Sequence, residues 1–83
     1  MHFVYLLKCR DKTLYCGYTN DLKKRILAHN SGKGAKYTRG RTPVKLVHSE
    51  KFRGKSKALK REFEIKGLSR KQKLLLVSNS ARK

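Results

Sequence analysis

Acidic side chains are scarce in this 83-residue chain. Only five Asp and Glu residues stand against 23 Lys and Arg residues, which gives a formal net charge of +18. A surface with this balance requires a polyanionic partner or heavy screening by salt, and nucleic acid is the first candidate. The scarcity also allows each carboxylate to be considered in turn as a site residue.

Long apolar runs and a secretory signal are missing as well. No stretch approaches the length that spans a membrane. The N-terminus opens on a strand-like pattern, without the basic segment, apolar stretch and cleavage site of a signal peptide. Neither an amphipathic basic helix with apolar anchors nor a lipidation motif is evident. We therefore expect a cytoplasmic protein, free or associated with the nucleoid, with no membrane partner.

Cysteine is nearly absent, with only Cys9 and Cys16 in the chain. There is no CxxC motif, and two Cys with scattered His residues lack the ligand spacing of a zinc site. A small intracellular chain has little opportunity to oxidise its thiols. The expectation is two reduced thiols inside the strands of one hairpin, in preference to a disulfide.

Two strands open the chain. Residues 2–10 carry apolar side chains at both odd and even positions, which is typical of a central strand covered on both faces. Residues 13–18 have high strand propensity. A two-residue turn between them would place Tyr5 and Tyr15 on opposite faces, whereas an odd-length loop or a bulge would unite them. Because Lys12 replaces the Gly that a tight turn prefers, we predict a longer or bulged connection and a shared face.

A helix is predicted directly after this hairpin. Asp21 offers a capping oxygen and a favourable negative charge, and the helix should extend to His29. A step of 100° per residue places Leu22, Arg25, Ile26 and His29 on one arc. Arg25 and His29 should therefore edge the buried face.

A long loop and a third strand follow. Residues 30–43 contain three glycines and four basic side chains without apolar periodicity, which indicates a functional loop. Residues 44–52 return to strand character, although Val47 breaks the strict alternation. This strand completes the expected three-stranded antiparallel sheet.

Two helices are expected after the third strand. Ser56 is the predicted cap of a helix over residues 57–66, which ends at the following glycine. Ser69 and Gln72 have the spacing of a capping box, which predicts a final helix through about Val77.

The elements define an α+β fold in the order β-β-α-β-α-α. A chain of 83 residues with 37% hydrophobic content can form one domain with a modest core. We expect that domain over residues 1–78, a short basic tail over residues 79–83, and a monomer.

One carboxylate falls on an apolar helix face. In the predicted second helix, Glu62 lies within the apolar arc and Glu64 lies outside it. The apolar members of that arc are Ala58, Leu59, Phe63 and Ile65. An inward carboxylate must be paired, hydrogen-bonded or bound to a cation. Glu62 is therefore either half of a salt bridge, to Arg25, Lys66 or another base, or a metal ligand.

The chain resembles the GIY-YIG nuclease superfamily, in particular its small stand-alone bacterial members. The resemblance covers nearly the whole chain, including the loop at residues 32–40 and the segment at residues 68–73. It is carried, in order, by Phe3-Val4-Tyr5, Tyr15-Cys16-Gly17, Arg25, His29 and Ala58-Leu59-Lys60-Arg61-Glu62. The first motif has Phe and Val in place of Gly and Ile, and the second has Cys in place of Ile, while the tyrosines and Gly17 are retained.

This resemblance implies phosphodiester hydrolysis with one divalent ion, Mg²⁺ by default and Mn²⁺ as a substitute. It assigns Tyr15 to help deprotonate the attacking water, Tyr5 to orient the site and Arg25 to bind phosphate. It assigns Glu62 to the metal, in agreement with the helix-face argument, and places His29 where relatives carry His or Tyr. A charged guanidinium fork and a hard cation on a carboxylate suit such chemistry.

The function implied is an endonuclease directed to DNA structure or damage, with weak sequence specificity and a role in repair or processing. RNA is the alternative substrate. The main rival is a binding module without turnover, in which loop bases grip phosphates and Tyr37 stacks on a base. Those bases are Lys33, Lys36, Arg39 and Arg41. A third hypothesis is a structural protein associated with RNA or the ribosome.

Overall fold

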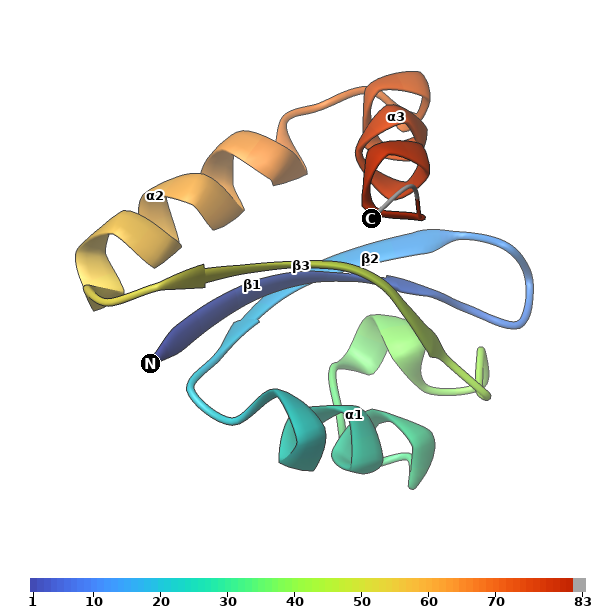
Figure 1. Ribbon diagram of the computed structural model, residues 1–83. Helices are drawn as coiled ribbons and strands as arrows, with labels where there is room; N and C mark the ends of the chain where they lie inside the picture. Colours follow the sequence, from blue (N-terminus) through green and yellow to red (C-terminus); the bar gives the residue numbers. More distant parts are fainter. Residues whose placement is uncertain (82–83) are drawn as a thin grey trace.

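A three-stranded antiparallel sheet lies between two helical layers (Figure 1). The computed structural model describes the backbone of residues 1–81 and the side chains of residues 1–79. The strands are β1 (His2–Lys8), β2 (Leu14–Thr19) and β3 (Lys45–Phe52), in the order β2-β1-β3. On one face lie α1 (Leu22–Asn30) and the 3₁₀ turn η1 (Lys36–Thr38), and on the other lie α2 (Lys55–Lys66) and α3 (Arg70–Ala81). The predicted α+β class and element order are confirmed.

The central strand β1 divides the core in two. Val4 and Leu6 point to the α2 and α3 side, where they cluster with Ala58 and Ile65. Tyr5 and Leu7 point to the α1 side. All four of these β1 side chains are buried, which confirms the prediction of a central strand covered on both faces.

The hairpin between β1 and β2 closes through an odd number of residues. The Cys9 N–H donates to the Thr13 carbonyl at 2.9 Å, and the Lys12 N–H donates to the Cys9 carbonyl at 2.9 Å. Lys12 has a φ of +69°, the left-handed conformation that completes this kind of three-residue turn. In the resulting register Tyr5 and Tyr15 lie on the same face, as predicted.

The pairing of β1 with β3 contains a bulge. Leu6 pairs with His48, whereas the next residue pairs with Leu46, so that Val47 is the extra residue on β3. Val47 packs on the α2 and α3 side. The break in alternation seen in the sequence therefore marks a real irregularity of the strand.

Local side chains set the helix starts. The Lys24 N–H donates to the Asp21 carboxylate at 3.1 Å, as expected for the α1 cap. The predicted start of α2 was wrong by two residues. The helix begins at Lys55, and its N-cap is Gly54, not Ser56. Gly54 is extended (φ −106°, ψ 136°) and makes no side-chain capping bond, since glycine is tolerated at this position without one.

The predicted capping box at the start of α3 is present. The Ser69 N–H donates to Gln72 Oε1 at 2.9 Å, and the Gln72 N–H donates to Ser69 Oγ at 3.2 Å. The helix continues to Ala81, past the predicted end near Val77, which itself packs against the core. The final two residues of the predicted tail lie outside the described part of the chain. Within that part, no helix is both long and apolar enough to cross a membrane.

Both cysteines are free and buried, as expected. They lie on opposite sides of the sheet, Cys9 toward α1 and Cys16 toward α2. Cys9 stands just beyond the end of β1 and not inside the strand. Burial raises the pKa of Cys16 to about 11, with the Glu62 charge adding to the effect, so its thiol stays protonated.

Candidate active site

Three aromatic rings meet on the α1 side of the sheet. The Tyr5 hydroxyl lies 3.0 Å from His29 Nε2, and both side chains are fully buried. The Tyr15 ring centroid lies 6.4 Å from that of Tyr5 and 5.4 Å from that of His29. His29 lies deeper than the predicted edge of the α1 face, because the loop after the helix folds back over it.

Gly17 leaves the space that the Tyr5 ring occupies. The two residues are directly opposed in the β1 and β2 pairing. A Cβ at position 17 would stand 2.6 Å from Tyr5 Cζ, closer still to its hydroxyl, and 3.1 Å from Tyr15 Cε2. Only glycine therefore allows the Tyr5 hydroxyl to cross over β2 toward His29.

Thr38 fixes the tautomer of His29. Its hydroxyl lies 2.9 Å from His29 Nδ1 and donates its single proton to the Ala35 carbonyl at 2.9 Å. On this ground we assign Nδ1 as the donor to Thr38, so that Nε2 carries the lone pair and accepts the hydrogen bond of the Tyr5 hydroxyl. The Ala35 N–H, at 3.4 Å from Nδ1, is a weaker competitor.

Thr38 and Gly34 are site residues that the sequence reasoning missed. Thr38 is fully buried within η1. A Cβ on Gly34 would stand 2.7 Å from both Cα and Cγ of His29, so this glycine allows the loop to close over the imidazole. Their segment has no periodicity, and the only sequence signal was that the loop itself shares in the GIY-YIG resemblance.

Burial sets the protonation states of the pair. Burial raises the pKa of Tyr5, and the Tyr15 and Glu62 charges add to this, while nearby Arg25 opposes it. Burial, followed by the Arg25 charge, lowers the pKa of His29. Near neutral pH the imidazole is therefore neutral and the phenol protonated, in agreement with a bond from Tyr5 to His29.

Replacing Thr38 by Val is expected to destabilise the fold by about 1–3 kcal/mol, because the isosteric side chain leaves the buried Nδ1–H of His29 without an acceptor. Urea unfolding would measure the loss, and ¹⁵N chemical shifts of the imidazole would report the tautomer. Thr38→Ser should restore both values toward those of the wild type. Equal stability of the Val variant and the wild type would contradict the tautomer assignment.

Arg25 stands beside this cluster on α1. It is half-buried and close enough to the Tyr5 hydroxyl to lower its pKa. Together with Lys24 it lines a hollow of about 250 Å³ at the start of the helix. A permanently charged residue that lies near the buried phenol thus also lines an open hollow, where a phosphate could reach it.

Glu62 approaches the cluster from the opposite helical layer. Its side chain is 19% exposed and lies 3.2 Å from Lys66 Nζ. Its carbonyl lies 3.9 Å from Cys16 Sγ, which places it beside β2, an edge strand. The Glu62 charge makes a small contribution to the raised pKa of Tyr5, behind those of burial and Tyr15.

The salt bridge expected as one alternative for Glu62 is present, with Lys66 as the partner. Although burial lowers it, the net pKa of Lys66 is raised by the bond to Glu62, with a contribution from Tyr15. Tyr15, Glu62 and Lys66 therefore share one electrostatic environment. The role of Glu62 as a metal ligand stays a prediction.

The donor set around Glu62 suits a weakly held, hard cation. In residues 1–81, no three His, Cys, Asp or Glu side chains gather as they do in a multi-ligand metal centre. Mg²⁺ commonly takes one or two carboxylates and completes its shell with water and substrate phosphate. A single, half-shielded carboxylate fits that pattern.

The predicted rotation of α2 was wrong in one respect. Glu62 faces inward and Glu64, at 53% exposed, faces solvent, as expected. Phe63, however, is 80% exposed instead of buried. The buried residues of the helix are Ala58 and Ile65, which turn its inward direction away from Phe63.

The predicted nucleic-acid-binding residues of the loop fall into two groups. Lys33, Lys36 and Arg39 are exposed. Tyr37, 40% exposed, has its ring stacked 5.7 Å from that of Tyr15. The Arg41 guanidinium lies 4.4 Å from the Tyr37 ring centroid and donates to Asp11 at 2.9 Å. Tyr37 and Arg41 are thus engaged within the chain.

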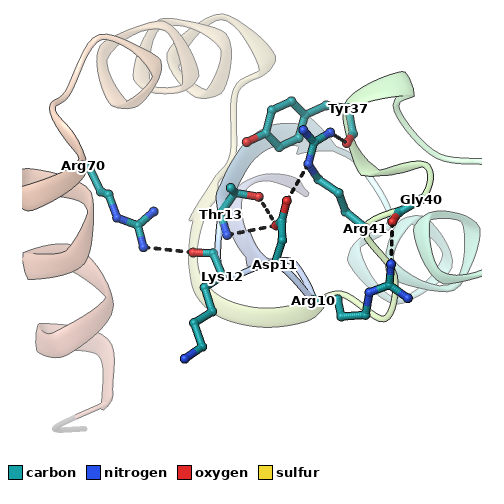
Figure 2. Close-up of polar contacts among 8 residues, drawn as sticks. All are labelled: Arg10, Asp11, Lys12, Thr13, Tyr37, Gly40, Arg41 and Arg70. Carbon is teal, nitrogen blue, oxygen red and sulfur yellow. Dashed lines mark hydrogen bonds and ion pairs between the residues drawn. The ribbon is translucent and has the colours of Figure 1, made fainter.

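Figure 2 shows how the hairpin tip joins the loop to α3. Arg41 bridges Asp11 and the Tyr37 carbonyl, and Arg10 donates to the Gly40 carbonyl at 3.0 Å. From the other side, Arg70 donates to a carbonyl of the hairpin turn at 3.0 Å. The loop that covers His29 is therefore anchored at its far end, which keeps Tyr37 against Tyr15.

Residues 1–74 match the GIY-YIG catalytic domain. The chain belongs to the GIY-YIG family. The tyrosines, Gly17, Arg25 and Glu62 that carry the GIY-YIG resemblance all lie within the matched residues. Nucleases of the family generally depend on a divalent metal, and membership supports a nuclease-type function acting on nucleic acid.

Several small proteins are similar over nearly their whole length to this GIY-YIG chain. The UPF0213 protein of Natronomonas pharaonis is 58% identical over 78 residues, covering 94% of this chain and 92% of that protein. The UPF0213 protein of Clostridium perfringens is 59% identical over 81 residues, covering 98% and 87%. Their names assign no activity.

Two solved structures share the GIY-YIG fold described above. The solution structure of a UPF0213 protein from Bacillus halodurans is 53% identical with a TM-score of 0.61, covering 93% of this chain and 82% of that one. The solution structure of a protein from E. faecalis is 43% identical with a TM-score of 0.65, covering 99% and 88%.

Proposed function

We propose that this chain is a divalent-metal-dependent endonuclease that hydrolyses phosphodiester bonds in DNA. Its targets would be chosen by structure or damage, with weak sequence specificity, in DNA repair or processing. The observation that carries the proposal is the hydrogen bond from Tyr5 to the buried, neutral His29, with Arg25 beside it and Glu62 across the β2 edge. Side chains that only fill the core would not need these buried hydrogen bonds and charged neighbours.

Each side chain has a role that its surroundings allow. Tyr5 donates its hydroxyl hydrogen bond to His29 and stays protonated, so its oxygen lone pairs are left to orient a water molecule. Tyr15, on the same face, is the residue proposed to help deprotonate that water. Arg25 offers a fixed positive charge to the phosphoryl oxygens as negative charge builds up on them.

Glu62 would hold the divalent ion, Mg²⁺ by default and Mn²⁺ as a substitute. When bound, such an ion polarises a phosphoryl oxygen and offsets the charge of the transition state. Lys66, at 3.2 Å from the carboxylate, balances the Glu62 charge before the ion arrives. The bare carboxylate therefore does not repel the incoming phosphate.

A binding module without turnover is the second candidate, and the same ion pair favours it. A Glu62 already neutralised by Lys66 could sit next to a polyanion without any metal. Strong, salt-dependent binding from the +18 charge is expected of either function. Only the metal dependence of cleavage separates them.

Arg25→Ala is expected to lower the cleavage rate by about 10²–10³-fold, the usual effect of removing a group that stabilises transition-state charge. The assay would follow nicking of flaps, branches, single strands and duplexes with Mg²⁺, Mn²⁺ or EDTA. Lys23→Ala, which removes an exposed cation on the same helix, should stay within about threefold of the wild type. Wild-type cleavage no faster than that of Arg25→Ala on every substrate would refute the proposal.

A further inference from the structure

An exposed apolar stripe runs along α2 next to Glu62. Phe63 is 80% exposed, more than any other large apolar side chain of the described residues. Leu59, four positions earlier, is 42% exposed and lies beside it on the helix surface. Because Ala58 and Ile65 provide the packing of α2, the stripe is not needed for the core.

Cations flank the stripe on both sides. Lys60 and Lys66 are exposed and lie three positions before and after Phe63, which makes them its neighbours on the helix. Lys66 is paired with Glu62, so Lys60 is the cation left for a phosphate while that pair is intact. Proteins that bind single strands combine an aromatic ring, on which a base stacks, with positive charges that follow the backbone. The surface around Phe63 has both components.

The stripe lies on the same helix as the proposed metal ligand. Phe63 follows Glu62 directly, and the helical step turns its ring outward by about 100° from the carboxylate. A strand with one phosphate between Arg25 and Glu62 would pass α2 with its neighbouring nucleotide near this ring. A base inside a duplex is already stacked on both sides, and exposing it breaks both that stacking and its pairing.

We propose that Phe63 stacks on an unpaired base next to the scissile phosphate, so that the site selects nucleic acid with unpaired nucleotides. The placement of that phosphate rests on the proposed function. A second copy of the chain is a poor occupant of this surface. One aromatic ring and part of a Leu side chain would bury much less area than the roughly 800 Å² per partner of a stable interface. The flanking lysines on two chains of charge +18 would also repel each other.

The test measures binding in EDTA, where no strand is cut. Fluorescence anisotropy would compare a fluorescein-labelled thymidine strand of about 12 nucleotides, an abasic strand of equal length and charge, and a blunt duplex. Phe63→Ala should weaken binding to the thymidine strand by about 5- to 100-fold and change the other two by less than about twofold. Phe63→Tyr should keep the preference for bases, and Leu75→Ala, which truncates an exposed side chain on α3, should bind like the wild type.

Three outcomes would overturn the stacking proposal. They are unchanged binding of the thymidine strand by Phe63→Ala, an equal loss on the abasic strand or the duplex, and a dimer in sedimentation that depends on Phe63. The result is independent of turnover. If the chain prefers bases but cuts nothing with Mg²⁺ or Mn²⁺, the stacking proposal stands and the nuclease proposal fails. If the chain cuts but shows no base preference, the nuclease proposal stands and the stacking proposal fails.

Discussion

Replacing Glu62 by Gln is expected to lower metal-dependent cleavage by at least about 10²-fold, because a neutral amide holds a hard cation poorly and a bound ion lowers the barrier by several kcal/mol. Binding of nucleic acid should be unchanged or slightly tighter, since Lys66 loses its partner and becomes available to phosphate. Nicking assays and anisotropy on the same substrates would measure both effects. Lost cleavage with retained binding is the pattern that distinguishes an enzyme from a binding module.

Glu64→Gln is the matched control for this experiment. It removes an equal charge from the same helix, but its side chain is 53% exposed and points to solvent. Its cleavage rate should stay within about threefold of the wild type. If the two variants lose activity equally, the effect reflects the net charge of α2, and Glu62 is not the metal ligand.

Gly17→Ala is expected to destabilise the domain by about 1–3 kcal/mol through overpacking, because the new Cβ would collide with the ring of Tyr5, which is buried and cannot move aside. In a domain of this size each kcal/mol corresponds to roughly 4–8 °C in Tm. The displaced phenol would also lose its bond to His29, so cleavage should fall even at temperatures where the variant is folded. Thermal unfolding and nicking rates would measure the two losses separately.

Gly67→Ala provides the comparison. A Cβ at that position meets its nearest atom at 3.5 Å, an ordinary contact, and the backbone has a φ of −82° that alanine adopts freely. Its stability should lie within about 0.5 kcal/mol of the wild type. A Gly17→Ala variant as stable as Gly67→Ala would show that the tyrosine cluster has room to adjust.

The register of the tyrosines was predictable because it depends on a parity. One residue more or fewer in the turn moves every β2 side chain to the other face, so the unsuitability of Lys12 for a tight turn was enough to decide it. The capping box of Ser69 and Gln72 was predictable for a similar reason, since its two bonds join residues only three positions apart. Features that depend only on residues close together in the chain can be predicted from the sequence.

The rotation of α2 was not fixed by short-range rules. Leu59 and Phe63 are apolar, so they widened the predicted inward arc, but the residues that α2 buries are Ala58 and Ile65. Which side of a helix faces inward depends on the surface that it meets, and the sequence of the helix does not describe that surface. The predicted inward orientation of Glu62 is nevertheless correct, because Glu62 lies between the buried side chains and the exposed stripe on the helix surface.

The contacts of the loop were also beyond the sequence. Thr38 reaches His29, and Arg41 reaches Asp11 from 30 positions away, through a segment without periodicity. A basic side chain in such a loop was interpreted as a phosphate ligand, yet Arg41 had a carboxylate within the chain. With only five acids, a base that has such a partner is the exception, and composition does not tell which base it is.

The bulge at Val47 affects how the chain behaves at high concentration. β3 is an edge strand, and a regular edge presents a row of unpaired backbone groups on which another strand can assemble. The extra residue interrupts that row, and Lys45 and Lys51 are exposed along the same strand. The irregularity that adapts β3 to the core therefore also protects this small sheet against growth into aggregates.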